Sequence, residues 1–478
     1  MVRNPLGSEQ RPIPIRRHAP PHACDESPIV SSPHEGDSLH PTSSALSATW
    51  QLLLGVGILM LGAGLQSTEI SLRATLEGFA APITGIVMSC YYLGYLFGTA
   101  AAPHLVRRVG HIRVFAAMAA VASATILVQG IFVHPLAWAL LRGISGLSFA
   151  AIYGVVESWL NDTSTRATRG RLFAVYMVVL YIGLGGAQFL LIPANPRTAT
   201  PFMLAGAFIS LAMVPILIAA QRAPEIALPR KVSYRELYRN SPLGVVAVTV
   251  AGMVTSSVYS MGPVYAQLSG LSTSGVATFM GVSVLAAVLG QYPIGRLSDR
   301  VDRRSVIAGV CVIAGVCATV LTVFRHLPQL VFLALTAAFS VVAFTIYSLG
   351  VSHVNDQLEP SQMVAASGAL LRLNGLGAAV SPVVLGSLIA AFGPRSYFAT
   401  LASLTLLLTA FDLWRKHHRQ SLPAELKGRF VAAGPQGPGP RIATNPLALS
   451  DAAGPPDRTA GAPAQTESDD GSTEKVRH

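Results

Sequence analysis

Charged residues are scarce in this sequence. Of its 478 residues, 12% are Asp, Glu, Lys or Arg, whereas 51% are hydrophobic and the mean hydropathy is +0.51. A soluble domain carries roughly 25% charged residues, because its surface must be covered by groups that water can solvate. A water-soluble body of this length is therefore excluded.

Cysteine is scarce as well, and the spacing of the four thiols forms neither a disulfide framework nor a zinc motif. Three of them fall in apolar segments, which favours thiols packed among apolar side chains. The sequence also lacks a P-loop, an HExxH motif and a nucleophile elbow, which argues against an ATP-driven pump and against an enzyme. We expect no cofactor and no bound metal.

The hydrophobic residues form runs of about 20 residues, the length of helix that spans the roughly 30 Å of hydrocarbon in a bilayer. Helices satisfy their own backbone hydrogen bonds in lipid, and the alternating segments typical of a β-barrel are absent. The pattern predicts an all-α polytopic membrane protein with twelve transmembrane helices. The predicted spans are residues 49–70, 82–103, 112–133, 137–159, 172–192, 201–220, 243–267, 274–295, 305–325, 329–350, 364–391 and 396–416.

The formal net charge is +11, which would suit a nucleic-acid partner if the basic residues were clustered on one soluble surface. They lie instead in the loops between spans, and most of them follow the second, fourth, sixth and eighth spans. The positive-inside rule then places both termini in the cytoplasm. We therefore expect a protein of the cell (inner) membrane with no nucleic-acid partner.

Both ends of the chain differ in composition from the apolar region. Residues 1–46 are rich in Pro, Ser and His, and residues 417–478 are rich in Pro, Gly, Ala and Asp. Neither segment has apolar periodicity, so both are predicted to be disordered cytoplasmic tails. The longest basic loop, 221–242, divides the region between them into a first six-helix bundle at 47–220 and a second at 243–416.

The two predicted bundles share residues in the same order and at nearly constant offset. The offsets are 192, 194 and 192 residues for three pairs taken from the second, fourth and fifth spans and their counterparts. Such matches argue for the duplication of a six-helix unit. The pairs are Gly98 and Gly290, Asp162 and Asp356, and Gly183 and Gly375.

The sharpest motif lies in the turn between the eighth and ninth spans. Gly295 allows a close approach of helices, and Asp299 can accept N–H groups at a neighbouring helix N-terminus. Arg300, Arg303 and Arg304 can pair with carboxylates of the other half and hold this side of the protein shut. The alternative is that these arginines only enforce the topology.

This turn resembles the loop signature of the major facilitator superfamily, a glycine followed by Asp-Arg-x-Gly-Arg-Arg. One departure is Asp302, where the family has glycine. The counterpart in the first half, residues 103–112, is degenerate, because Arg107 and Arg108 stand where the family has Asp-Arg. The resemblance therefore implies a gate that differs between the two halves.

Further stretches resemble the same family. Arg142 begins an Arg-x-x-x-Gly element in the fourth span, and residues 155–158, 169–172 and 290–297 resemble the YcaD-like bacterial subfamily. The resemblance implies two pseudo-symmetric six-helix bundles around one central site. In this fold the site opens alternately to the two sides of the membrane.

A charged residue at membrane depth costs about 3 kcal/mol or more unless it is paired or faces water. Arg142 lies about one turn inside the fourth span and is predicted either to pack or couple helices or to extend to the interface. Arg372 lies deeper in the eleventh span, close to Asn374. We expect Arg372 to face the central cavity rather than to pair with a buried acid.

Two acidic residues lie near the ends of spans, Glu69 in the first and Glu157 in the fourth. Glu157 is predicted to act as a strut of the cytoplasmic gate by pairing with an arginine. Alternatively, either carboxyl group carries a proton, because a carboxyl group removed from water holds its proton more tightly. The candidate partners of Glu157 are Arg107, Arg108, Arg169 and Arg171.

Polar and aromatic side chains of the inner spans are predicted to line the central cavity. The alternative for each of them is a hydrogen bond between helices. Pro263 and Pro382 are candidate kinks within their spans. The candidate lining residues are Gln66, Tyr91, Tyr95, Tyr181, Gln188, Tyr259 and Asn374.

The resemblance implies a secondary active transporter of a small organic solute that works by alternating access and is coupled to protons. The embedded arginines favour an anionic or amphipathic solute, and efflux is favoured over uptake because no sugar-type signature is visible. Two alternatives stay open, namely uptake of a small anionic nutrient and a membrane receptor or lipid-handling protein on the same fold. The expected partners are the solute, the lipid bilayer and protons, and the chain is expected to be a monomer.

Overall fold

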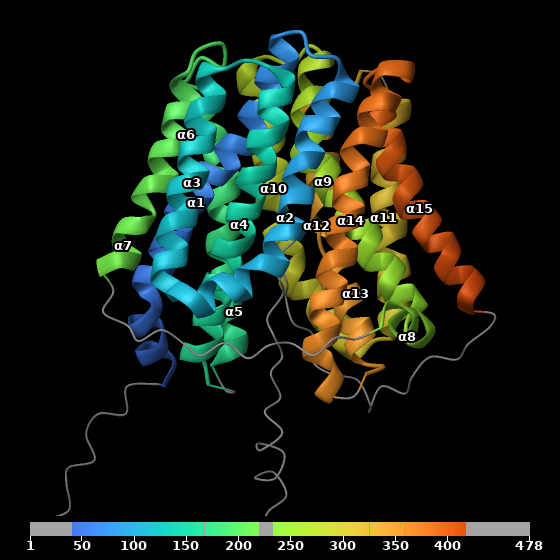
Figure 1. The fold of residues 1–478 in the computed structure, drawn as a ribbon. Helices are drawn as coiled ribbons and strands as arrows, with labels where there is room; N and C mark the ends of the chain where they lie inside the picture. Colours follow the sequence, from blue (N-terminus) through green and yellow to red (C-terminus); the bar gives the residue numbers. More distant parts are fainter. Residues whose placement is uncertain (1–40, 166–167, 219–232, 325, 359, 417–478) are drawn as a thin grey trace, which may run out of the picture.

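The structure is a bundle of long helices that run side by side (Figure 1). The computed structural model describes residues 41–416 except 166–167, 219–232, 325 and 359. Twelve helices of the described residues are long and apolar enough to cross a membrane, and no strand occurs among them. The predicted all-α class with twelve spans is therefore confirmed.

Three of the twelve spans are made of two consecutive helices, the fifth, the sixth and the tenth. The first four spans are α1 (Pro41–Leu76), α2 (Ala81–Val109), α3 (His111–Ile131) and α4 (Pro135–Thr163). The fifth and sixth spans are α5 (Arg169–Gly186) with η1 (Ala187–Leu191), and α6 (Thr200–Leu211) with α7 (Met213–Ile218). The remaining helices are α8 (Tyr234–Asn240), α9 (Pro242–Leu268), α10 (Thr273–Arg300), α11 (Arg303–Val323), α12 (Gln329–Ala343) with α13 (Ile346–Asn355), α14 (Pro360–Phe392) and α15 (Ser396–Lys416).

An even number of crossings places the two ends of the bundle on one side. Helix α1 begins and α15 ends at the same end, the lower end in Figure 1. We name this end the terminal face and the other end the opposite face. The turn between α10 and α11 lies at the terminal face, because every even-numbered span ends there.

Several boundaries differ from the predicted ones. Residues 41–46, predicted to lie in the tail, belong to α1, and α2, α4, α10 and α13 each continue for about one turn beyond the predicted end. Hydropathy marks the hydrocarbon layer, whereas the backbone hydrogen bonds of a helix continue into the polar interface. The rest of the predicted tails and most of the predicted inter-bundle loop lie outside the described residues.

Contacts within the halves repeat with the offset expected from a duplication. Gly98 of α2 lies against the carbonyl of Leu147 in α4, and Gly290 of α10 lies against the carbonyl of Val341 in α12. In each pair an added Cβ would collide with the carbonyl oxygen, so glycine lets the two backbones touch. The offsets of 192 and 194 residues equal those found in the sequence.

The fifth and eleventh spans correct one detail of that alignment. Gly183 of α5 lies near the carbonyl of Gly57 in α1, and Gly377 of α14 lies against the carbonyl of Thr249 in α9. The structural equivalent of Gly183 is therefore Gly377, two residues beyond the predicted Gly375. The repeated Gly-Leu-Gly sequence offered two registers, and the backbone contact selects one of them.

The two halves meet closely toward the opposite face. Gly85 near the start of α2 lies against the carbonyl of Pro382 in α14, and Gly386 of α14 lies against the carbonyl of Ala81. Next to this seam, the hydroxyl of Ser67 in α1 donates to the carbonyl of Tyr259 in α9 at 3.3 Å. These contacts hold the first half against the second at this end of the molecule.

Candidate functional site

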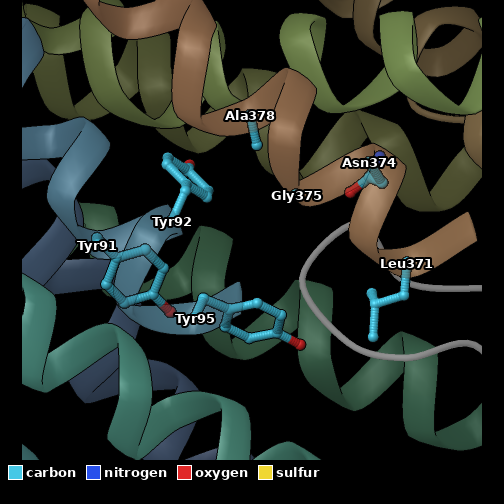
Figure 2. A pocket seen from close by; sticks show the side chains of 7 residues that line it. All are labelled: Tyr91, Tyr92, Tyr95, Leu371, Asn374, Gly375 and Ala378. Carbon is cyan, nitrogen blue, oxygen red and sulfur yellow. The ribbon is translucent and has the colours of Figure 1, made fainter. Parts of the chain in front are cut away.

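A pocket lies between the two halves, along the seam of α2 and α14. Tyr91, Tyr92 and Tyr95 line it from α2, and Figure 2 shows the Tyr92 side chain on the side of Ala378 in α14. The pocket is narrow and partly open to solvent. The lining from α14 consists of Leu371, Asn374, Gly375 and Ala378.

The lining follows from helix periodicity. Positions three and four apart lie on one face of a helix, so Leu371, Asn374 and Ala378 present one stripe of α14 to the pocket. Asn374 is buried, and its Nδ2 donates to the carbonyl of Val248 in α9 at 3.0 Å. The amide is thereby fixed at the pocket wall, in agreement with its predicted position.

The tyrosines form an aromatic wall that reaches into both halves. The ring of Tyr91 packs edge-on against Tyr92 at 5.3 Å between centroids and lies 6.2 Å from Phe149 of α4. The Tyr92 hydroxyl lies 3.5 Å from the Ser260 hydroxyl in α9 of the other half. Tyr92 was not among the predicted lining residues, although it directly follows Tyr91 in the sequence.

Arg142 lies directly behind this wall. Its guanidinium carbon is 4.4 Å from the centroid of the Tyr91 ring, a distance at which the face of the ring attracts a cation. The side chain is 3% exposed, and its Nε atom has no hydrogen-bond partner. None of the salt bridges among the described residues involves Arg142. The burial rules out extension to the interface, one of the two predicted alternatives.

Arg372 does not line the pocket, contrary to the prediction. The side chain is exposed, and its Nη1 lies 3.4 Å from the hydroxyl of Tyr234 in α8. The next residue in a helix is rotated by about 100°, so Arg372 points away from the stripe that includes Leu371. Arg372 is therefore not among the residues that line this pocket.

Gln66 and Gln188 fulfil the alternative prediction, hydrogen bonds between helices. Gln66 donates from Nε2 to the hydroxyl of Ser145 in α4 at 3.0 Å. Gln188 donates from Nε2 to the carbonyls of Leu184 and Gly64 at 2.8 and 3.2 Å. Neither residue lines the pocket, so both connect helices of the first half.

Tyr181 and Tyr259, two further predicted lining residues, pack around one aromatic ring at the seam. Their ring centroids lie 6.4 and 5.7 Å from that of Phe344, which lies between α12 and α13. Tyr181 belongs to the first half and Phe344 to the second. The cluster therefore joins the halves but does not belong to the pocket wall.

Glu69 is fully buried in α1, and neither of its carboxyl oxygens has a hydrogen-bond partner. One turn further along, the Nε of Arg73 forms a salt bridge with Glu77 at 2.6 Å. The same guanidinium donates from Nη1 to the carbonyls of Pro196 and Thr198 at 3.2 and 3.1 Å. The sequence analysis did not single out Arg73 and Glu77. The spacing of four residues that links them to Glu69 is present in the sequence.

Glu157 is buried, 3% exposed, at the terminal end of α4. Among the described residues, no salt bridge connects it with Arg107 or Arg108, which are exposed. Arg107 and Arg108 therefore do not form the predicted strut with Glu157 in this structure. Arg169, another predicted partner, donates from Nε to the hydroxyl of Ser164 at 3.2 Å.

The turn between α10 and α11 is arranged around Arg303, which is 1% exposed. Its Nη1 lies 2.8 Å from Oδ2 of Asp356, and its Nη2 lies 3.2 Å from Oδ1 of Asp299. Arg304 pairs with Asp412 of α15 at 3.3 Å. The predicted salt bridges of this motif therefore form, but their acids belong to the same half rather than to the other half.

Two details of the motif differ from the prediction. Asp299 pairs with the Arg303 side chain, and the N-terminus of α11 is capped by Asp302, which accepts from the backbone N–H of Ser305 at 3.3 Å. The residue that departs from the family pattern thus performs the capping expected of Asp299. Gly295 is buried and Arg300 is exposed.

The degenerate motif of the first half contains a histidine in place of Arg303. At the offset of 192 residues, His111 is the equivalent of Arg303, and Arg107 is the equivalent of Asp299. His111 is 3% exposed, and its Nε2 lies 3.3 Å from the hydroxyl of Ser158 in α4. At this position the first half therefore has a histidine–serine contact, where the second half has the salt bridges of Arg303. The two halves differ here at the terminal face.

Comparison with known proteins identifies the family. The sequence matches the model of the Major Facilitator Superfamily at residues 52–370 and 270–456. It is 29% identical to an uncharacterized MFS-type transporter of Enterobacter sp. (strain 638), over 74% of this chain and 92% of that protein. It is 27% identical to the uncharacterized MFS-type transporter YcaD of Escherichia fergusonii, over 77% of this chain and 95% of that protein.

Solved structures share the fold. The nucleoside transporter NupG matches with a TM-score of 0.65 and 14% identity, over 78% of this chain and 100% of that one. A bacterial homolog of the human lysosomal transporter Spinster, in an inward-facing and unoccupied conformation, matches with a TM-score of 0.64 and 13% identity, over 77% and 97% of the two chains. With its twelve spans, its duplicated halves and the family match over most of its length, this chain belongs to the major facilitator superfamily.

Proposed function

We propose that this protein is a secondary active transporter that moves a small organic solute by alternating access. The observation that carries the proposal is the pocket of Tyr91, Tyr92, Tyr95 and Asn374, because it lies between the two halves rather than inside either one. A solute bound there contacts both halves, so its binding responds to their relative movement. This is the arrangement that alternating access requires.

The packing at the opposite face supports the same mechanism. Gly85 and Gly386 bring the backbones of α2 and α14 into contact between the pocket and the opposite face. These contacts support a conformation that is closed at the opposite face. If the halves rock about the pocket, these contacts break and the solute reaches the other side.

The solute that fits the pocket best is a flat, partly apolar molecule with a negative charge. Tyrosine rings offer stacking surfaces, and the Asn374 amide offers a polar contact. Arg142 lies behind Tyr91 without a salt bridge among the described residues. A buried cation is costly without a counter-charge, and an anionic group of the solute would supply one once Tyr91 moves aside.

Proton coupling, efflux and a monomeric state complete the proposal. A buried carboxyl group without a partner, Glu69, supports coupling to protons. Efflux is favoured over uptake of an anionic nutrient because the sequence carries no sugar-type signature. The basic loops support a cytoplasmic terminal face in the inner membrane.

The test is uptake and efflux of a metabolite library by purified protein in proteoliposomes, with and without a pH gradient. We expect an anionic aromatic solute to move and the gradient to drive it. Arg142→Ala is expected to reduce its transport about tenfold or more, because a hydrogen bond to a charged group contributes roughly 1.5–3 kcal/mol. Arg372→Ala is the matched control and is expected to transport normally, since Arg372 is exposed on α14. Protein that moves no solute under either gradient would contradict the proposal.

A receptor or lipid-handling protein on the same fold is the second candidate, and one variant separates it from a transporter. Asp299 pairs with Arg303 far from the pocket. A transporter with Asp299→Ala should bind its solute but turn it over more slowly. A receptor should bind the solute equally well in both forms and show no turnover in either.

A further inference from the structure

Near the opposite face, the last turns of the first span carry Glu69 and Arg73, and Glu77 directly follows Leu76, the last residue of α1. Glu69, Arg73 and Glu77 are each four residues apart, so they follow one another along one side of the chain. Arg73 lies between two carboxyl groups at equal spacing. It pairs with Glu77 at 2.6 Å and leaves Glu69 without a hydrogen-bond partner.

The three side chains differ in their access to water. Glu69 is fully buried, whereas the side chains of Arg73 and Glu77 are 12% and 36% exposed. Arg73 is also held by the carbonyls of Pro196 and Thr198, from the loop that follows η1. The Arg73–Glu77 pair therefore covers Glu69 on the side of the opposite face.

A negative charge on Glu69 would have no salt-bridge partner in the described part of this structure. Arg73, one turn further along α1, is the basic residue that follows Glu69 in this helix, and no salt bridge among the described residues includes Glu69. One turn before Glu69, α4 supplies the Ser145 hydroxyl to Gln66 and α9 supplies the Tyr259 carbonyl to Ser67. Arg142 of α4, one turn from Ser145, contacts the Tyr91 ring and forms no salt bridge with Glu69 among the described residues. An ionised carboxylate enclosed in this way would cost several kcal/mol. The enclosed state therefore requires Glu69 to be neutral.

Helix geometry favours an exchange of partners once Glu69 is ionised. An acid four residues before a base forms a better pair than an acid four residues after it. Glu69 precedes Arg73 and Glu77 follows it, so an ionised Glu69 has the preferred orientation. Glu77 is more exposed, so it loses little interaction energy when it leaves Arg73 and is solvated by water.

We propose that Glu69 binds the coupling proton at the opposite face and that Arg73 exchanges between two partners as this proton binds and leaves. With Glu69 protonated, Arg73 pairs with Glu77 and the opposite face closes, as in this structure. When the face opens, the Glu69 carboxyl group releases its proton to water, its carboxylate pairs with Arg73, and Glu77 becomes solvated. The net charge of the three groups changes by one proton, which leaves to the solution.

This inference rests on the proposed proton-coupled transport, but the exchange itself can be tested without a solute. Protonation of Glu69 is followed by infrared spectroscopy of the full chain in lipid nanodiscs as the pH is raised, with Glu69→Gln as the reference that identifies its carboxyl band. We expect a protonated carboxyl band that Glu69→Gln removes. Absence of this band over the whole pH range would overturn the inference.

The companion variant is Glu77→Gln, which frees Arg73 for Glu69. It is expected to move the titration midpoint of Glu69 to lower pH by about one unit, a tenfold weaker hold on the proton. Glu236→Gln, in α8, is the matched control and is expected to leave the midpoint unchanged. A midpoint that stays in place or moves to higher pH in Glu77→Gln would refute the exchange.

The transport arm uses the solute identified by the library screen. Glu69→Gln is expected to exchange this solute across the membrane without a gradient but to lose its accumulation by a pH gradient. Accumulation by Glu69→Gln equal to that of the unmodified protein would overturn the assignment of the coupling proton. If the library contains no transported solute, the proposed function fails, while the infrared titration still decides on the partner exchange.

Discussion

Arg303 has two acidic partners that differ in their access to water. The Asp356 side chain is 5% exposed and lies at 2.8 Å, whereas the Asp299 side chain is 36% exposed and lies at 3.2 Å. Removal of one partner of a buried ion pair costs roughly 3–5 kcal/mol, because the remaining charge is left in a medium of low polarity. An exposed pair contributes about 0–1 kcal/mol.

These values predict different effects for the two acids. Asp356→Ala is expected to lower the thermal unfolding midpoint of the purified protein by several degrees, whereas Asp299→Ala is expected to change it little. The measurement is thermal unfolding in detergent, with both variants on the same background. Equal destabilisation by the two substitutions would contradict the assignment of Asp356 as the principal partner.

Arg142 and Arg372 illustrate what the sequence could predict about single residues. Hydropathy placed both inside apolar spans, and both are found in spans. The direction of a side chain depends on which face of its helix the neighbouring helices cover, and this information is spread over the whole chain. Arg142 therefore lies buried against Tyr91, while Arg372 reaches Tyr234.

Near the opposite face, the backbones of α2 and α14 lie in close contact. A Cβ added at Gly85 would collide with the carbonyl group of Pro382, which cannot move aside without moving α14. Overpacking of this kind costs roughly 1–3 kcal/mol. The cost falls only on the conformation in which these helices touch.

Gly85→Ala is therefore expected to shift the protein toward a conformation open at the opposite face, by about tenfold in population. The measurement is the rate at which a membrane-impermeant maleimide added at that face labels Ala378→Cys in the pocket, on a background without the four natural cysteines. Gly154→Ala is the control, because an added Cβ there meets no atom within 4 Å. A labelling rate unchanged by Gly85→Ala would show that this contact does not hold the face closed.

The helices also show where local sequence patterns were insufficient. Pro263 and Pro382, the predicted kinks, lie inside α9 and α14, where a proline removes one backbone hydrogen bond of the helix. The tenth span is interrupted between α12 and α13, at Phe344 and Thr345. Neither residue is a glycine or a proline. The Phe344 carbonyl accepts a hydrogen bond from Nε2 of Gln291 in α10 at 3.3 Å. A neighbouring helix thus satisfies the interrupted backbone, and no local pattern could have predicted it.

At the scale of the whole molecule, the duplication was the most reliable guide. The pairing of Gly98 with Gly290 in the sequence reappears as matching contacts with Leu147 and Val341. The number of spans followed from hydropathy alone. The pocket did not, because it is formed by α2 and α14, which are nearly 300 residues apart along the chain and whose contact depends on the association of two separately packed halves.

The orientation in the membrane gives the prediction for the whole molecule. Val301 lies in the turn at the terminal face, and Ser269 lies exposed between α9 and α10 at the opposite face. In a background without cysteine, Ser269→Cys is expected to react with an impermeant maleimide in intact cells, and Val301→Cys only after permeabilisation. Labelling of Val301→Cys from outside intact cells would reverse the assigned topology.

The salt bridge between Arg304 and Asp412 has a consequence for biogenesis. Asp412 is fully buried one turn before the end of the last span, and a charged side chain without a partner within a span opposes insertion into the bilayer. Its partner was synthesised 108 residues earlier, at the start of α11. We therefore expect α15 to enter the lipid beside α11 rather than alone. Insertion of the last span would then depend on α11, a helix that the translocon has already released into the membrane.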